Sequence, residues 1–275
     1  MIKADLYEQI NTIVSVLVSV AIFVFFMVRK EDSWSLMRIA YDKTESLRQK
    51  NKFLRVLFSK WTFTAFTAAA YAGLYNAIFV FGNFPRFLAN DTYFTYTNYF
   101  CALFFGILVV MGIQLLVGMD FRYGTDLLTP FFALDVGLGK IACFCAGCCY
   151  GIEWTNGMFN YNTGRIEFPV QLLEVFVGIL LSAVLFFCLT KRKSTGRIYP
   201  LYMILYGATR FCTEFLRGDH IANWMGLKPY QMLCLCSILI GACWLIVISL
   251  LEKYDKRFLY GTNLVDYIIS KKGKA

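Results

Sequence analysis

The feature that most constrains this chain is a series of seven long apolar stretches separated by more polar segments. A helix that crosses a bilayer needs about 20 consecutive, mostly apolar residues. Seven windows meet this requirement, at residues 10–28, 61–81, 100–119, 127–149, 170–190, 198–216 and 230–251. The sequence therefore predicts an all-α, polytopic integral membrane protein with about seven transmembrane helices.

The composition agrees with this fold class. Apolar residues make up 58% of the 275 residues and charged residues only 16%, whereas soluble domains are about 45–50% apolar and about 25% charged. The first window follows Lys3 but has no small-residue cleavage site before Arg29 and Lys30, so we interpret it as an uncleaved span. We expect residues 1–275 to form a single transmembrane domain.

The basic residues predict how the chain is oriented in the membrane. Most lie in the segments that follow the first, third, fifth and seventh windows. The opposite side holds only Lys3, Arg86, Arg165, Arg217 and Lys228. Because cytoplasmic segments carry an excess of Lys and Arg, we expect the N-terminus outside and the C-terminus in the cytoplasm. The same distribution argues against a nucleic-acid partner, although the net charge is +9.

Segment 29–60 is the most basic of the cytoplasmic segments and too polar to span the membrane. Its apolar residues around Leu54 and Leu57 are compatible with an amphipathic helix on the inner leaflet, which anionic lipids would attract. A solvated linker explains the composition equally well.

A few ionisable residues fall inside the apolar windows, where such groups are costly and therefore indicate function. These are Asp135, Lys140, Glu174, Arg210 and Glu214, with Asp126 at the start of the fourth window and Arg217 where the sixth one ends. All except Asp126 fall in the outer half of the membrane in the predicted orientation. We expect them to converge on one cavity that opens outward.

The spacing of these residues indicates two roles. Arg210 and Glu214 are four residues apart, so they share a helix face and can form an ion pair, which by itself can be purely structural. Lys140 lies five residues from Asp135, a spacing that disfavours a direct pair, and is better placed to face an external anion. Two cations near the outer headgroup level, Lys140 and Arg210, suit the phosphate ester of a lipid.

Cysteines are dense between Cys143 and Gly151. On a continuous helix, Cys145, Cys148 and Cys149 would share one face. Soft thiolates can bind zinc, copper(I) or an iron–sulfur cluster, or act as a redox or nucleophilic thiol. A four-thiol metal site usually uses two separated pairs, and the sequence has no second pair with that spacing. We therefore prefer packing over a reactive thiol site at Cys143, Cys148 and Cys149, and either over a metal. No cofactor is expected.

Other catalytic signatures are lacking in the sequence. The single histidine, His220, follows the sixth window in a loop, where such residues usually face solvent. The chain contains no G-x-S-x-G, P-loop, H-E-x-x-H or dinucleotide fingerprint. These absences leave serine-hydrolase, nucleotide-binding and zinc-protease functions without support.

Three separated blocks match the motifs of a known family. Residues 139–151, from Gly139-Lys140 to Gly151, follow G-R-x-G-N-F-x-N-x-E-x-x-G, with Asp126 and Pro130 upstream. Residues 168–174 look like H-P-x-Q-L-Y-E, and residues 206–217 look like Y-G-x-x-R-x-x-x-E-F-x-R, followed by Asp219. Over roughly residues 61–219 the chain therefore resembles the prolipoprotein diacylglyceryl transferases of bacteria.

The resemblance implies seven spans in the bacterial plasma (inner) membrane. It also implies transfer of a diacylglyceryl group from phosphatidylglycerol to the lipobox cysteine of a prolipoprotein, with release of glycerol phosphate. By position, the catalytic residues would be Lys140, Arg210 and Glu214: the two cations hold the phosphate and Glu214 orients Arg210. The lipid-binding residues would be Lys140, Arg210, Tyr206, Gly151, Gln171 and Glu174, with Gly151 allowing close approach of the lipid.

The chain departs from the family motifs at several positions. The signature Arg is Lys140, the Asn is Cys143 and the Glu is Cys148, which identifies a cysteine-rich divergent branch. The tyrosine that the family has in its first span corresponds to Thr12. No general base for the acceptor thiol is evident. Two alternatives are an enzyme that uses Cys148 or Cys149 as nucleophile or redox thiol, and a non-catalytic phospholipid-binding or transport protein.

Overall fold

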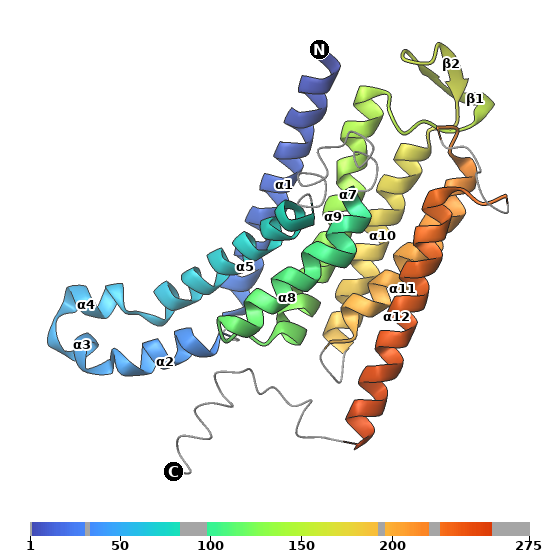
Figure 1. Ribbon diagram of the computed structural model, residues 1–275. Coiled ribbons are helices and arrows are strands. Elements are labelled where there is room, and N and C mark those ends of the chain that lie inside the picture. The colour runs from blue at the N-terminus through green and yellow to red at the C-terminus, as the bar shows by residue number, and fades with distance from the viewer. Residues whose placement is uncertain (1, 31–33, 83–97, 192–195, 220–225, 255–275) are drawn as a thin grey trace. The chain divides into compact units, whose positions relative to one another are not determined.

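A computed structural model describes residues 2–30, 34–82, 98–191, 196–219 and 226–254. It is mostly helical, as expected for a polytopic membrane protein (Figure 1). The chain divides into two compact units, one made of Met1–Val18 and Thr129–Leu250, the other of Ser19–Leu128 and Leu251–Ala275. That residues 1–275 act as one domain stays a prediction.

Five helices are long and apolar enough to cross a membrane. Their spans are Leu6–Arg29, Lys52–Gly82, Phe121–Ala146, Val170–Lys191 and Pro229–Leu250. The third and sixth predicted windows are also helical, but the uninterrupted apolar helices there are shorter, at Ala102–Leu116 and Ile198–Thr213. The structure thus supports an integral membrane protein, and the count of seven spans and the orientation stay predictions.

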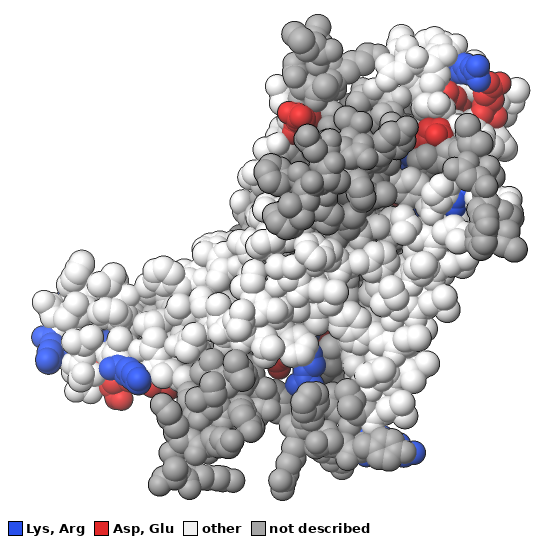
Figure 2. Space-filling model, viewed as in Figure 1, with Lys and Arg blue, Asp and Glu red and all other residues white. Residues whose placement is uncertain are grey.

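The unit built around Ser19–Leu128 contains the C-terminal part of α1 (Ile2–Arg29) and the helices that follow it. These are α2 (Ser35–Lys43), α3 (Glu45–Lys50), α4 (Lys52–Leu57), α5 (Lys60–Gly82), α7 (Asn98–Cys101), the π-helical turn η2 (Ala102–Gly106) and α8 (Ile107–Leu116). Phe26 of α1 stacks on Tyr71 of α5, with ring centroids 4.2 Å apart. The basic segment forms three short helices, and charged side chains gather over them, whereas the visible surface of α8 carries none (Figure 2).

The unit built around Thr129–Leu250 contains four helices that contact one another in chain order. They are α9 (Phe121–Ala146), α10 (Val170–Lys191), α11 (Ile198–Thr213) with the 3₁₀ turn η3 (Glu214–Leu216), and α12 (Pro229–Tyr254). Phe132 of α9 packs edge-on against Tyr202 of α11, and Tyr199 of α11 packs against Trp244 of α12. These apolar contacts fix the position of α11 against the helices on both sides.

Helices α9 and α10 touch backbone to backbone. A Cβ on Gly178 would lie 2.4 Å from the Gly137 Cα, so only glycines permit this crossing. Lys140 lies about one turn after Gly137, and Glu174 about one turn before Gly178. Because the two helices run in opposite directions, the glycine contact brings both charged residues to the same level.

One element departs from the all-α prediction. Strands β1 (Glu153–Asn160) and β2 (Arg165–Glu167) form an antiparallel hairpin in the connection between α9 and α10. Gly164, at φ +70°, supplies the left-handed residue that closes the turn. The hairpin lies outside the apolar windows, so the apolar pattern that predicts the spans could not predict these strands.

Candidate functional site

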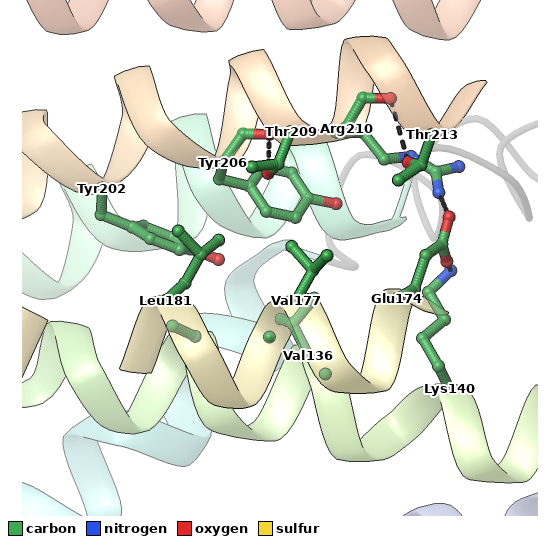
Figure 3. Close-up of a pocket in the computed structure, with 13 residues that line it drawn as sticks. Val136, Lys140, Glu174, Val177, Leu181, Tyr202, Tyr206, Thr209, Arg210 and Thr213 are labelled. Atoms are coloured by element: carbon green, nitrogen blue, oxygen red, sulfur yellow. Dashed lines mark hydrogen bonds and ion pairs between the residues drawn. The ribbon is translucent and has the colours of Figure 1, made fainter. Parts of the chain in front are cut away.

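Five charged residues from α9, α10 and the end of α11 form one group, which we call the ion-pair cluster. They are Lys140, Glu174, Arg210, Glu214 and Arg217. Glu174 lies at its centre: Lys140 Nζ is 2.9 Å from Glu174 Oε2, and Arg210 Nη1 contacts Glu174 Oε1. Figure 3 shows both cations pointing at this carboxylate from opposite sides. The amine and the guanidinium, 70 residues apart in the sequence, therefore share one chamber.

Glu214 holds Arg210 from the other side. Arg210 Nη2 lies 3.0 Å from Glu214 Oε2, the pair that the four-residue spacing predicted, and the Glu214 side chain is fully buried. Arg210 thus forms ion pairs with two carboxylates, and these fix the plane of its guanidinium. Removing either partner would leave a buried charge without compensation.

Arg217, which the sequence places where the sixth window ends, belongs to the same cluster. Its Nη1 is 3.7 Å from Glu174 Oε1, and its Nε is 3.9 Å from Glu214 Oε2. It also binds Asp219 through two hydrogen bonds. Burial opposes the charge of Arg217, but the hydrogen bonds and negative charge of Asp219, together with the nearby Cys149, outweigh burial and raise the pKa of this guanidinium. In the sequence, Arg217 follows Glu214 by three residues, a spacing that places both side chains on the same side of a helical turn.

Lys228 completes the cation set. Its Nζ donates to the carbonyl oxygens of Glu214 and Arg217, at 2.7 and 2.6 Å, and so satisfies acceptors that the end of α11 leaves open. Burial lowers the pKa of Lys228. With Asp219 included, the described contacts join four cations to three carboxylates, so most of the charge in this site is paired within the protein.

A small cavity adjoins the cluster. It encloses about 30 Å³ between α9, α10 and α11. Lys140, Glu174 and Arg210 form its polar end, and Val136, Val177, Leu181, Tyr202 and Tyr206 line the rest (Figure 3). A polar end continuous with an apolar slot matches the two parts of a phospholipid. The space holds about one water, so entry of a lipid requires the helices or side chains to move.

Two predicted lipid-binding residues have structural partners. Gly151 lies against the backbone, where a Cβ would meet the Phe168 carbonyl oxygen at 2.2 Å, and it forms a β-bridge with Arg217. Packing between chain segments thus suffices to require glycine there. Gln171 Nε2 donates to the Cys148 carbonyl at 2.8 Å. Lipid contact by either residue stays a prediction.

The cysteine run does not continue the helix, so the prediction that Cys145, Cys148 and Cys149 share a helix face is wrong. Helix α9 ends at Ala146, and Gly147 adopts a left-handed φ of +67°. The Gly147 amide then donates to Phe144 O and the Cys148 amide to Cys143 O, both at 3.1 Å, which is a Schellman motif. The glycine in the middle of the run is what ended the helix early.

This turn brings together a different set of three thiols, Cys143, Cys148 and Cys149, which we call the thiol cluster. Their sulfur atoms lie within 4.8 Å of one another. Cys145 points away and is exposed. Hydrogen bonds from Cys143 and Cys148, with the nearby charges of Lys140 and Arg217, lower the pKa of Cys149. The same hydrogen-bonding network raises the pKa of Cys148.

Residues 97–247 match the model of the family described as prolipoprotein diacylglyceryl transferase, which covers more than half of the chain and the whole site. The chain is 37% identical over 124 residues to the phosphatidylglycerol–prolipoprotein diacylglyceryl transferase of Clostridium tetani, covering 42% of this chain and 49% of that protein. It is 34% identical over 134 residues to transferase 2 of Clostridium perfringens, covering 46% and 52%.

A third relative, the phosphatidylglycerol–prolipoprotein diacylglyceryl transferase of Francisella tularensis subsp. mediasiatica, is 28% identical over 192 residues, which cover 64% of this chain and 71% of that protein. The matches to the two clostridial relatives span about half of the length of those proteins. The family match, by contrast, includes every member of the ion-pair and thiol clusters. The chain belongs to the prolipoprotein diacylglyceryl transferase family.

Proposed function

We propose that this protein transfers a diacylglyceryl group from phosphatidylglycerol to the lipobox cysteine of a prolipoprotein and releases glycerol phosphate. The observation that carries the proposal is the convergence of Lys140 and Arg210 on Glu174 beside a cavity with an apolar wall. The names of the relatives, which refer to this donor and this acceptor, support it.

In the proposed mechanism, Lys140 and Arg210 bind the phosphate of the donor lipid. A lysine has three N–H donors and an arginine five, so each keeps donors for a phosphate besides those directed at Glu174 and Glu214. When the acceptor thiolate attacks the glyceryl carbon, the carbon–oxygen bond breaks and negative charge grows on the departing phosphate. Donors fixed in a buried site stabilise that charge, and removing one typically costs about 10²–10³ in rate.

The carboxylates have a positioning role in this proposal. Glu174 keeps the two cations together while no lipid is bound, and Glu214 fixes Arg210 at 3.0 Å. Arg217, which reaches both carboxylates, limits their freedom to swing away. The site is therefore organised before the lipid arrives, and less binding energy is lost to ordering it.

We further propose seven spans in a bacterial plasma membrane, with the N-terminus outside. The 16 residues of α11 extend for about 24 Å. The three residues of η3 add about 6 Å. Together they match a hydrocarbon core of about 30 Å. An epitope tag after Thr163, in the hairpin turn, tests the orientation: it should be accessible from outside intact spheroplasts, and accessibility only in inverted vesicles would contradict the proposal.

The decisive test of function is complementation in bacteria depleted of their own transferase, with lipid attachment to a reporter prolipoprotein as the readout. The wild-type chain should restore attachment, and purified protein in phosphatidylglycerol vesicles should release glycerol phosphate. Failure of the correctly inserted wild-type chain would exclude the transferase function. Phosphatidylglycerol binding without its consumption would instead favour a lipid-binding protein.

The matched variants are Arg210→Ala and Arg165→Ala. Both remove a guanidinium that is paired with a glutamate, but Arg165 lies in the hairpin with 65% of its side chain exposed, whereas Arg210 is 6% exposed. Only Arg210→Ala should abolish transfer. Full activity in both variants would exclude the proposed phosphate site.

A further inference from the structure

The thiol cluster has the geometry of a metal site. A metal–sulfur bond to zinc is about 2.3 Å, so sulfurs around one tetrahedral ion are about 3.8 Å apart. The three sulfurs here already lie within 4.8 Å, and small rotations about their side-chain bonds would close the difference. Within the described ranges, no other three His, Cys, Asp or Glu side chains come together in this way.

The backbone around the cluster is held in an uncommon conformation. Cys149 has a φ of +57°, which non-glycine residues rarely adopt. Three contacts keep the turn in place: the Schellman bonds at Cys143 and Phe144, the bond from Gln171 to the Cys148 carbonyl, and that from the Gly218 amide to Tyr150 O at 3.0 Å. Strain of this kind persists where surrounding structure enforces it, and such positions concentrate at functional sites.

The surroundings suit an anionic metal–thiolate centre. A divalent ion with three thiolates carries a net charge of −1. The positive charge of Arg217 lies near the Cys149 sulfur, and Lys140 lies three residues before Cys143 on the same face of α9. Tyr7 of α1 lies near the Cys143 sulfur. The two cations thus connect the thiol cluster to the ion-pair cluster, since both also contact Glu174.

We propose that Cys143, Cys148 and Cys149 bind one thiophilic divalent metal ion, zinc foremost, and leave a fourth position for the thiol of the acceptor. Structural zinc sites use four protein ligands, whereas catalytic ones use three and keep one position open. Among the residues that the structure describes, no fourth His, Cys, Asp or Glu joins the group. This departs from the sequence-based preference for packing, which rested on the lack of a second pair of cysteines and did not consider a three-thiol site with an open position.

The role of the ion in the reaction rests on the proposed transferase function. The acceptor thiol replaces water at the open position and releases its proton to solvent, because a coordinated thiol is deprotonated. Its sulfur then forms a bond to the glyceryl carbon while the carbon–oxygen bond to phosphate breaks. The electron pair of that bond leaves on the phosphate oxygen, and the metal keeps its charge. Such a centre supplies the thiol activation for which the sequence offers no general base.

The test is the metal content of the full-length protein purified in detergent. The wild type should carry about one zinc per chain, and Cys149→Ser should lose at least about tenfold in zinc affinity, as should Cys148→Ser. Cys145→Ser is the matched control, since it removes an exposed thiol of the same run, and it should retain the metal. Cys148→His replaces one ligand type by another and should recover binding that Cys148→Ser loses, which separates ligation from misfolding.

Two outcomes would overturn the site. One is wild-type protein, loaded with zinc and washed, that carries no more metal than the Cys143→Ser/Cys148→Ser/Cys149→Ser variant. The other is an intact mass two hydrogens lower than the reduced chain, with a disulfide mapped within the cluster in the protein as isolated from membranes. Cobalt(II) substitution offers a second readout, because thiolate-to-cobalt charge transfer should appear in the wild type and disappear in the triple variant.

The same preparations separate this inference from the proposed function. Metal binding with no glycerol phosphate release by the wild type would remove the transferase proposal and the role of the ion, but leave the site standing. Transfer at the wild-type rate by a metal-free Cys149→Ser variant would leave the transferase standing and exclude the ion from the reaction. Loss of transfer on chelation, restored by zinc, would support both.

Discussion

The ion-pair cluster and the thiol cluster meet at the end of α9 but are built in opposite ways. The first joins residues from three helices, up to 77 positions apart between Lys140 and Arg217. The second lies within seven consecutive residues, 143–149. One depends on how helices pack and the other on a single turn. Changes in helix packing should therefore damage the ion-pair cluster most. Changes in the turn should damage the thiol cluster most.

The largest effect should come from Arg210→Ala. It leaves Glu174 and Glu214 buried without their main partner, and breaking a buried pair costs about 3–5 kcal/mol. Transfer should fall by about 10²–10³ beyond any loss of folded protein. Thermal unfolding in detergent measures the loss of stability, and the transfer rate per folded molecule measures the loss of activity. The control, Arg165→Ala, should change stability by at most about 1 kcal/mol.

The zinc content of folded Arg210→Ala sharpens the comparison. Since Arg210 contacts Glu174 and Glu214 rather than the sulfurs, the thiol cluster should keep its metal. Loss of zinc in the folded variant would mean that the two clusters form one cooperative unit.

The next effect concerns the contact that aligns the helices. Gly178→Ala places a Cβ 2.4 Å from the Gly137 Cα, which forces α9 and α10 apart and separates Lys140 from Glu174. Overpacking of this kind costs about 1–3 kcal/mol, and we expect transfer to fall at least about tenfold. Gly73→Ala in α5, with nothing within 4 Å, should instead stabilise the protein by about 0.5–1 kcal/mol. Equal effects of the two substitutions would contradict the backbone contact.

The sequence predicted the ion-pair cluster well because charges in apolar windows are rare and the cost of burying them forces them together. Lys140, Arg210 and Glu214 converge as expected. Arg217, expected where the sixth window ends, also joins them, and the turn at η3 directs it toward Glu174 and Glu214. The Gly137–Gly178 crossing could not be read from the sequence, since Gly73 and Gly112 lie in similar apolar segments and have no such contact.

The thiol cluster was predicted less well because turn geometry decides it. The structure brings Cys143, Cys148 and Cys149 together, and their role stays a prediction. The helical arrangement expected for the run was wrong, since Gly147 was read as part of a span. The hairpin after Tyr150 was missed for a related reason: apolar windows report membrane depth and carry no information about strands outside it. His220 falls outside the described residues.

A moderate effect should follow from Gln171→Leu. The substitution keeps the size of the side chain but removes the bond to the Cys148 carbonyl, so the turn loses one of its restraints. Loss of an interaction that supports metal ligands typically costs about 10–100-fold in affinity, and we expect the lower end. Competition with a zinc chelator measures it. Asn162→Ala, which removes the bond to the Ala146 carbonyl at 2.6 Å from the exposed hairpin, is the comparison and should have a smaller effect.

The smallest effect concerns the reactivity of the thiols themselves, in protein stripped of metal. The lowered pKa of Cys149 means that its thiolate persists as pH falls, whereas the raised pKa of Cys148 keeps that thiol protonated. Iodoacetamide should therefore modify Cys149 several-fold faster than Cys148 at neutral pH, and its rate at Cys149 should change little between about pH 6 and about pH 8. The advantage stays modest because a thiolate of low pKa is a weaker nucleophile. Peptide mapping after brief alkylation distinguishes the two sites. Arg217→Gln, which removes one of the nearby charges that favour the Cys149 thiolate, should shift the pH dependence of its rate upward, and an unchanged profile would mean that the ion-pair cluster does not influence the thiols.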